Sequence, residues 1–283
     1  MPVEEIIDKT IQTAPIHKNI IEEYTANMYT KGRINIRKNN ILMNYIPSMF
    51  KLKKGVQEYI TESYSELHYT PPDIFDRKIR AYHGTIDKIK NFNENILDYF
   101  DVNIYSNSVF EVKLISPICS NAKKYYNYQI DSVCNDKSGG HLYYISFKPK
   151  LNSYQLIEGY VAICDKTWII RKLSFCGRSE YLNYTNTVQM GNDNNGHEKL
   201  LPVRFDSKMS FHLLGNVIDG YFTIDMDYQS VKLPETPLPV NNRKSKYDLT
   251  QSFTLRNDTS AYIRTDRNYF AQLRPIPLSE DEK

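Results

Sequence analysis

The chain has 283 residues, enough for one large domain or two small ones, and 41% of them are apolar, which suffices for a packed core. Its formal net charge of +3 is too small to indicate a nucleic-acid partner. The sequence contains no apolar run long enough to cross a membrane as a helix.

The N-terminal segment has helical periodicity. Its apolar stripe predicts a helix over residues 3–28, with Pro15 as a candidate break point; the stripe consists of Ile6, Ile7, Ile11, Ile20, Ile21 and Tyr24. This pattern starts directly after Met1 and Pro2, so no signal peptide is visible. We expect either a cytoplasmic protein or an excised piece of a longer exported chain.

Alternation of apolar and polar residues predicts strands along much of the remaining chain. The residues after Tyr24 lead from the helix into a first strand, and residues 73–100 combine helix-compatible stretches with turns. Further strands are predicted over residues 56–69, 125–133, 141–149, 157–164, 168–175, 203–213 and 218–230. Prolines 234, 237 and 239 then predict an extended tail.

The most regular pattern is a hairpin formed by residues 203–213 and 218–230. With Gly215-Asn216 as its two-residue loop, Arg204 would oppose Asp227, and Asp206 would oppose Asp225 as a like-charge pair. The predicted apolar face carries large, soft side chains, namely Phe205, Met209, Phe211, Phe222, Ile224, Met226 and Tyr228.

Residues 31–57 form a basic segment with no acid before Glu58. Its cations flank the apolar residues 41–50 and are Lys31, Arg33, Arg37, Lys38, Lys51, Lys53 and Lys54. Apolar residues between cations could contact an anionic membrane surface or a protein partner. The alternative is a hairpin whose apolar side is buried and whose cations face solvent.

No motif in the sequence predicts a catalytic residue, a metal site or a cofactor. The four cysteines form no C-x-x-C pair and are predicted to be buried thiols outside any disulfide, and the six histidines lack ligand spacing. Asp225 and Asp227 share one strand face, which would suit calcium binding or acid–base catalysis. The alternative is a solvated face neutralised by Arg204 and Lys208.

Several stretches resemble an uncharacterised family of Bacteroidetes cell-envelope proteins. These are ESYSELHY from residue 62, FDVNIY from 100, LISPI from 114, AKKYYNY from 122, GYVAICDKTWII from 159 and LRPIPLS from 273. Members typically carry a carboxypeptidase-regulatory-like β-sandwich before this region and a β-rich region after it. The resemblance implies a periplasmic or outer-membrane-associated piece of a longer exported protein, with flanking domains as partners.

The order of elements is also similar to that of the LolA and LolB type of lipoprotein carrier, in which an open half-barrel wraps helices and holds acyl chains. We therefore predict an α+β, mostly antiparallel fold: an open half-barrel over residues 1–232, with the N-terminal helix and short helices on its concave face. Residues 233–283 would form the extended, proline-containing tail leading to a further domain.

The best functional hypothesis is a non-enzymatic module of a larger protein. It would bind a lipid or lipoprotein acyl chain on the predicted apolar face of the hairpin. The second hypothesis is a structural or interaction module that positions flanking domains and has no ligand. A hydrolase, supported only by Asp225 and Asp227, is a remote third.

Overall fold

The structure is a computed structural model that describes residues 1–38, 56–70, 74–85, 103–109, 114–135, 140–191, 200–234, 254–258, 265–275 and 278. Its helices are α1 (Val3–Lys18), α3 (Ala122–Tyr125) and α4 (Arg267–Leu273). Its strands are β1 (Glu23–Lys38), β2 (Glu58–Thr70), β3 (Ile74–Gly84), β4 (Ser108–Val109), β5 (Leu114–Ile115), β6 (Tyr126–Asn135), β7 (His141–Pro149), β8 (Glu158–Cys164), β9 (Ile170–Arg178), β10 (Leu182–Met190), β11 (Pro202–Leu213), β12 (Asn216–Lys232) and β13 (Thr254–Asp258).

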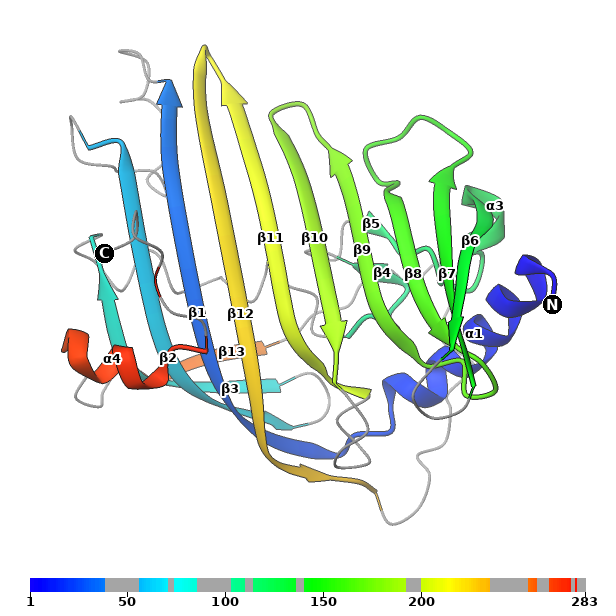
Figure 1. Cartoon of the computed structure of the whole chain (residues 1–283), viewed down its shortest axis with the longest axis horizontal. Coiled ribbons are helices and arrows are strands. Elements are labelled where there is room, and N and C mark those ends of the chain that lie inside the picture. The colour runs from blue at the N-terminus through cyan, green and yellow to red at the C-terminus, as the bar shows by residue number, and fades with distance from the viewer. Residues whose placement is uncertain are drawn as a thin grey trace.

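One 11-stranded sheet dominates the described residues, in the order β13-β3-β2-β1-β12-β11-β10-β9-β8-β7-β6 (Figure 1). All neighbouring strands are antiparallel except β13 and β3, and the sheet stays open because β13 and β6 are its two edges. The pairing of β1 with β12 joins the two ends of the predicted domain. The predicted α+β, mostly antiparallel open sheet is therefore confirmed.

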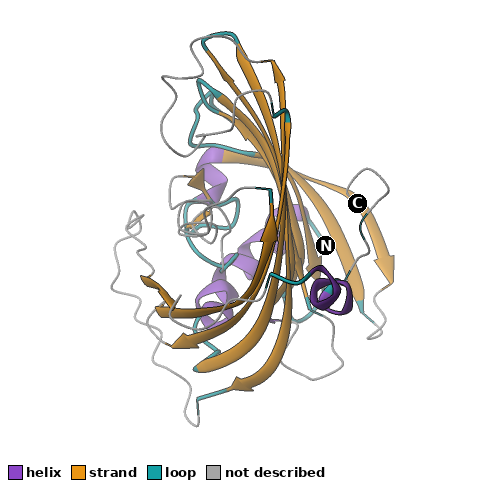
Figure 2. Ribbon diagram, turned by 90° about the vertical axis from the view of Figure 1, so that its left-hand side faces the viewer, coloured by secondary structure: helices purple, strands orange, loops and turns teal. Residues whose placement is uncertain are grey.

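The sheet is strongly curved, and each face is covered by different helices (Figure 2). The main core lies on the concave face, where α1 and residues 103–109 and 114–125 pack against alternate strand residues such as Met28, Phe205 and Ile224. On the opposite face, here called the outer face, Phe270 of α4 packs against Tyr29. The prediction of helices on the concave face thus holds for α1 and α3, whereas α4 lies in the stretch predicted as a tail and packs on the outer face.

The predicted N-terminal helix is too long. It ends at Lys18, with Pro15 inside it, and the chain enters β1 at Glu23. Tyr24 and the alternate residues after it are buried as one face of a strand rather than as a helical stripe. Residues 74–84 form β3, so the expectation of helix-compatible stretches is wrong there, while residues 86–102 lie outside the description.

The β11–β12 hairpin is confirmed, and its register differs from the prediction. The turn residues are Leu214 and Gly215, with φ of 50° and 79°, so Leu213 pairs with Asn216. Positive φ at both central residues is the geometry that matches the twist of a two-residue hairpin. As a result, Arg204 opposes Asp225, and Asp206 opposes Thr223. The predicted like-charge pair does not form.

Two elements lie within the stretch predicted as an extended tail. β13 adds a parallel strand beside β3, and α4 packs on the outer face. None of the four cysteines forms a disulfide. The predicted burial holds for Cys119 and Cys164 and is wrong for Cys134, which is exposed, while Cys176 is partly exposed. Among the described residues, no helix has the length and apolar character that crossing a membrane requires.

Candidate functional site

The seven predicted ligand residues all lie on β11 and β12, and they divide by burial. Phe205, Ile224 and Met226 are at most 8% exposed and belong to the main core. The other four are partly exposed and pack at the margins of the apolar clusters: Met209, Phe211, Phe222 and Tyr228. The concave face is therefore partly a filled core, and β11 and β12 contribute partly exposed apolar side chains at its margin.

Phe222 lies along the surface of the sheet over two glycines. A Cβ at Gly32 would come within 3.0 Å of its ring, and a Cβ at Gly220 within 2.9 Å. Because glycine has no side chain, Gly32 on β1 and Gly220 on β12 leave room for the Phe222 ring. Met209, the strand partner of Gly220, lies beside it, so Met209 and Phe222 form one continuous apolar patch.

Three buried polar side chains adjoin this apolar patch and are here called the polar band: Asn186 on β10, Ser207 on β11 and Thr30 on β1. Asn186 is the strand partner of Ser207, and Ser207 is the strand partner of Phe222. Asn186, Ser207 and Phe222 therefore lie in one row across β10, β11 and β12. Thr30 follows on the far side of β12, where it pairs with Ile224. The three band residues are 5%, 2% and 3% exposed, respectively.

The polar band has no hydrogen-bond partner among the described residues. This holds for both amide atoms of Asn186 and for the hydroxyls of Ser207 and Thr30. A buried polar group without a partner costs about 1–3 kcal/mol, so each such group in a native protein calls for a specific explanation, and a bound ligand or ordered water is one. The arrangement places hydrogen-bonding capacity directly beside the apolar patch.

Arg77 of β3 is a buried cation on the same face. It is 1% exposed, and its guanidinium donates to the hydroxyls of Ser65 at 3.1 Å and Ser63 at 3.2 Å. Burial lowers the pKa of Arg77 to about 10. Ser63 is the strand partner of Thr30, so the guanidinium lies next to one end of the polar band.

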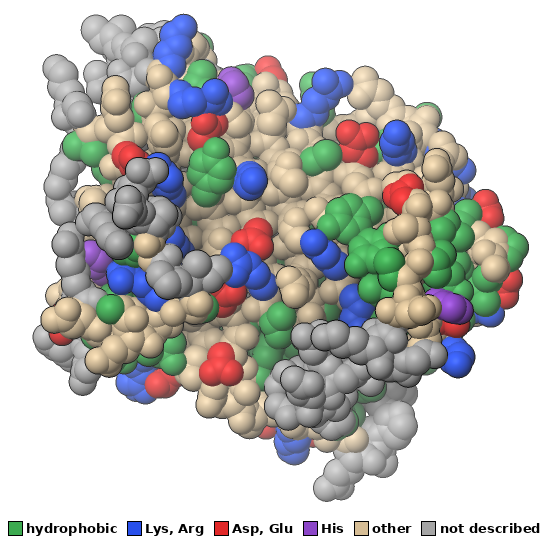
Figure 3. Space-filling view, in the orientation of Figure 1, with side chains coloured by type: hydrophobic (Ala, Val, Ile, Leu, Met, Phe, Trp, Pro, Cys, Tyr) green, Lys and Arg blue, Asp and Glu red, His purple; other side chains and the backbone are tan. Residues whose placement is uncertain are grey.

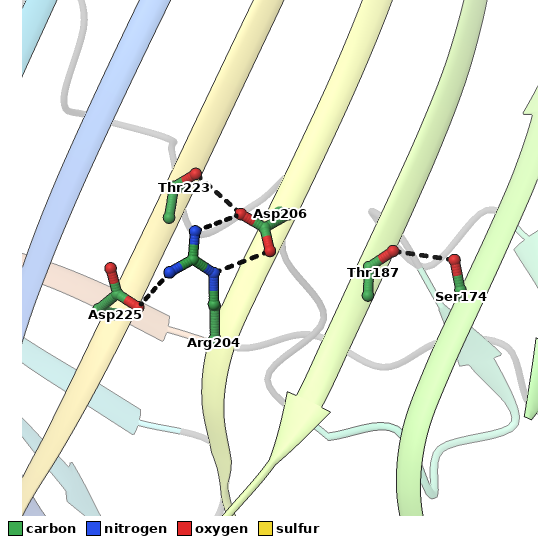
Figure 4. Close-up of polar contacts among 6 residues, drawn as sticks. All are labelled: Ser174, Thr187, Arg204, Asp206, Thr223 and Asp225. Atoms are coloured by element: carbon green, nitrogen blue, oxygen red, sulfur yellow. Dashed lines mark hydrogen bonds and ion pairs between the residues drawn. The ribbon is translucent and has the colours of Figure 1, made fainter. Parts of the chain in front are cut away.

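The outer face holds the aspartates that suggested a hydrolase or a calcium site. Arg204 lies between Asp206, at 2.9 Å, and Asp225, at 3.3 Å, and Thr223 donates to Asp206 (Figure 4). Burial raises the pKa of Asp225 against the opposing effect of Arg204. Asp227 accepts from the amide of Gln229. The predicted neutralisation by Arg204 is confirmed for Asp225, whereas Lys208 opposes Tyr221 instead.

The described cations of the basic segment lie on β1. Arg33 forms an ion pair with Glu58, and Arg37 forms one with Asp219, whereas Lys31 is partly exposed and Lys38 is exposed. Acidic and basic side chains are interspersed over the face of the molecule seen in Figure 3. Lys51, Lys53 and Lys54 lie outside the described residues, so membrane or partner contact by this segment stays a prediction.

A buried polar cluster that the sequence did not predict attaches the C-terminal helix to the sheet. Glu62 of β2 is 1% exposed and accepts two hydrogen bonds from Arg274, at 2.7 and 2.6 Å, and one from Tyr29 at 2.5 Å. Burial opposes ionisation, but the bonds from Arg274 and Tyr29 outweigh it and lower the pKa of Glu62. Glu62 and Arg274 are 212 positions apart, so no local pattern links them.

Beside this cluster, the outer face has a cavity of about 530 Å³ between the end of α4 and the sheet. Its lining includes Tyr64, Asp225, Asp227, Leu273 and Pro275. Within the described part of the chain, no group of three or more histidine, cysteine or acidic residues is arranged to hold a metal ion.

Residues 6–229 match the model of a family of unknown function, DUF5686. The chain belongs to this family. A stretch of 132 residues, 46% of this chain, is 29% identical to the MATH and LRR domain-containing protein PFE0570w of Plasmodium falciparum, and it spans 1% of that protein's length. Neither match assigns chemistry to a residue.

Solved structures with partial similarity include a LolA superfamily protein and a putative lipoprotein-sorting protein domain. The LolA superfamily protein NE2245 of Nitrosomonas europaea is 11% identical, with 81% of this chain and 94% of that chain covered and a TM-score of 0.26. A putative outer membrane lipoprotein-sorting protein domain of Vibrio parahaemolyticus is 10% identical, with 80% and 93% covered and a TM-score of 0.27. Scores this low do not support an argument about function.

Proposed function

We propose that this domain is a non-enzymatic module that binds the hydrocarbon chain of a lipid or lipoprotein on the concave face of its open sheet. The observation that carries the proposal is the apolar patch of Met209 and Phe222. These large side chains are partly exposed next to the buried, unpartnered atoms of Asn186 and Ser207. A core that only had to be packed would gain stability from apolar residues at those polar positions.

The same proposal locates the domain in the periplasm or at the outer membrane, within a longer exported protein. It is supported by the resemblance of its motifs to cell-envelope proteins. Flanking domains of that protein would be its other partners, and no catalytic residue, metal or cofactor is part of the proposal.

A second candidate function is a scaffold that positions flanking domains and binds no ligand. It is favoured by one observation: β13 and α4 return from the C-terminal stretch to the sheet, where Arg274 holds the chain against Glu62. In this version, the apolar patch is only the margin of the core.

Native mass spectrometry of the purified protein, combined with lipid extraction of the same sample, separates the two candidates. We expect a co-purifying apolar species that is lost in Phe222→Glu. The matched control is Tyr221→Glu, because Tyr221 is the next residue on β12, is 45% exposed and faces the outer side. A clean apo mass for the wild type, or equal retention in both variants, would favour the scaffold.

A further inference from the structure

The chemistry of the polar band specifies which part of a ligand it can accept. Asn186 offers one donor group and one acceptor, and the hydroxyls of Ser207 and Thr30 each offer both. None of the three carries a charge, and all are at least nine-tenths buried without a described partner. Such a set of neutral dipoles satisfies an uncharged polar group, but it does not neutralise a buried carboxylate or phosphate.

The register places the polar band at the edge of the apolar patch. Ser207 is the strand partner of Phe222, and Met209 lies two positions further along the same face of β11. Consecutive residues on one strand face are about 7 Å apart. A chain lying against Met209 and Phe222 therefore brings the group attached to its end within reach of Ser207 and of its partner Asn186.

The buried cation is at the other end of the face. Arg77 is bonded to Ser63 on β2, and three strand spacings, about 14 Å along the sheet, separate β2 from β11. Because Asn186 and Ser207 lie beyond this separation, an ionised head group bound to Arg77 would leave them without a partner.

We infer that the ligand is an amphiphile whose acyl chain carries an uncharged ester or amide group, which hydrogen-bonds to Asn186 and Ser207. This inference rests on the proposed function, since it specifies the chemical class of ligand for the same site. Acylglycerols and N-acylated groups have this chemistry, whereas free fatty acids do not.

Thermal stability separates a ligand-binding role of Asn186 and Ser207 from a structural one. If Asn186 and Ser207 serve a ligand, Asn186→Leu with Ser207→Ala removes no internal hydrogen bond and relieves buried polar atoms. The melting temperature of the ligand-free variant is then expected to rise by about 2 °C or more. If the two side chains have a structural role, the same variant melts at a lower temperature.

The experiment measures binding of three matched probes to the full chain by displacement of a fluorescent apolar dye: monomyristoylglycerol, myristate and tetradecane. For the wild type we expect the acylglycerol to bind most tightly. In the double variant, its affinity is expected to fall at least 10-fold while that of tetradecane is unchanged. Thr185→Val on β10 is the matched control, because Thr185 is exposed on the outer face.

Two results would overturn the inference while leaving the proposed function intact: an unchanged acylglycerol affinity in the double variant, or tighter binding of myristate that is lost in Arg77→Gln. Absence of binding by all three probes would instead reject the proposed function itself. Ser207→Ala alone makes the same comparison if the double variant does not fold, because it removes a single hydroxyl.

Discussion

Glu62 holds Arg274, the residue directly after α4, against the sheet. It is 1% exposed and shares its carboxylate between Arg274 and Tyr29, which come from opposite ends of the chain. A buried acid is tolerated only when it is paired and hydrogen-bonded, so the two partners and Glu62 depend on one another.

Removal of the cation is therefore expected to be costly. Arg274→Ala leaves a buried, unpaired carboxylate, and we expect the free energy of unfolding, measured by urea denaturation, to fall by about 3 kcal/mol. Arg256→Ala is the control, because its ion pair with Asp76 is exposed and is expected to contribute less than about 1 kcal/mol. Equal losses in both variants would contradict this account of the cluster.

The same cluster predicts sensitivity to acid. The pKa of Glu62 in the folded chain lies below its ordinary value of 4.5, so its stabilising contribution is complete above pH 4.5. That contribution is lost as the pH falls below 4.5 and through the lower folded value. Amide hydrogen exchange in α4 should accelerate over this range in the wild type. A Glu62→Gln variant should lack this step, and its persistence in that variant would assign it to another group.

At the scale of elements, alternation predicts most of the strands that have one apolar and one polar face, but not β3, whose buried face carries Arg77. β10 was missed because Asn186 occupies the buried face between Tyr184 and Val188 and interrupts the apolar pattern. Asn186, whose position hides the strand pattern of β10, is also part of the polar band. The apolar side chains of the candidate site on β11 and β12 could therefore be predicted from the sequence, whereas the polar band could not. The register of the β11–β12 hairpin could not be predicted because it depends on the backbone φ of Leu214. The docking of α4 could not be predicted because it depends on a contact between residues 212 positions apart.

The hairpin turn offers a direct test of its register. Leu214 has φ of 50°, a conformation that costs a non-glycine residue about 1 kcal/mol and that asparagine tolerates better. Leu214→Asn creates an Asn-Gly turn, and we expect the free energy of unfolding to rise by about 1 kcal/mol. Leu214→Ala should give no such gain. A loss of stability in the asparagine variant would argue for the loop at Gly215-Asn216.

At the scale of the whole molecule, the open sheet has two faces with different contents. The outer face combines paired charges with the docked C-terminal helix. The concave face carries the main core, the apolar patch and the polar band. The central claim is that this concave face binds a hydrocarbon chain, with the polar band at one end of it.

The most direct test is photo-crosslinking with a monoacylglycerol that carries a diazirine on its acyl chain, followed by mapping of the adducts by mass spectrometry. The account predicts adducts on Met209, Phe211 and Phe222, competed by unlabelled monoacylglycerol. Adducts confined to outer-face residues such as Tyr221, or labelling that the competitor does not reduce, would contradict it.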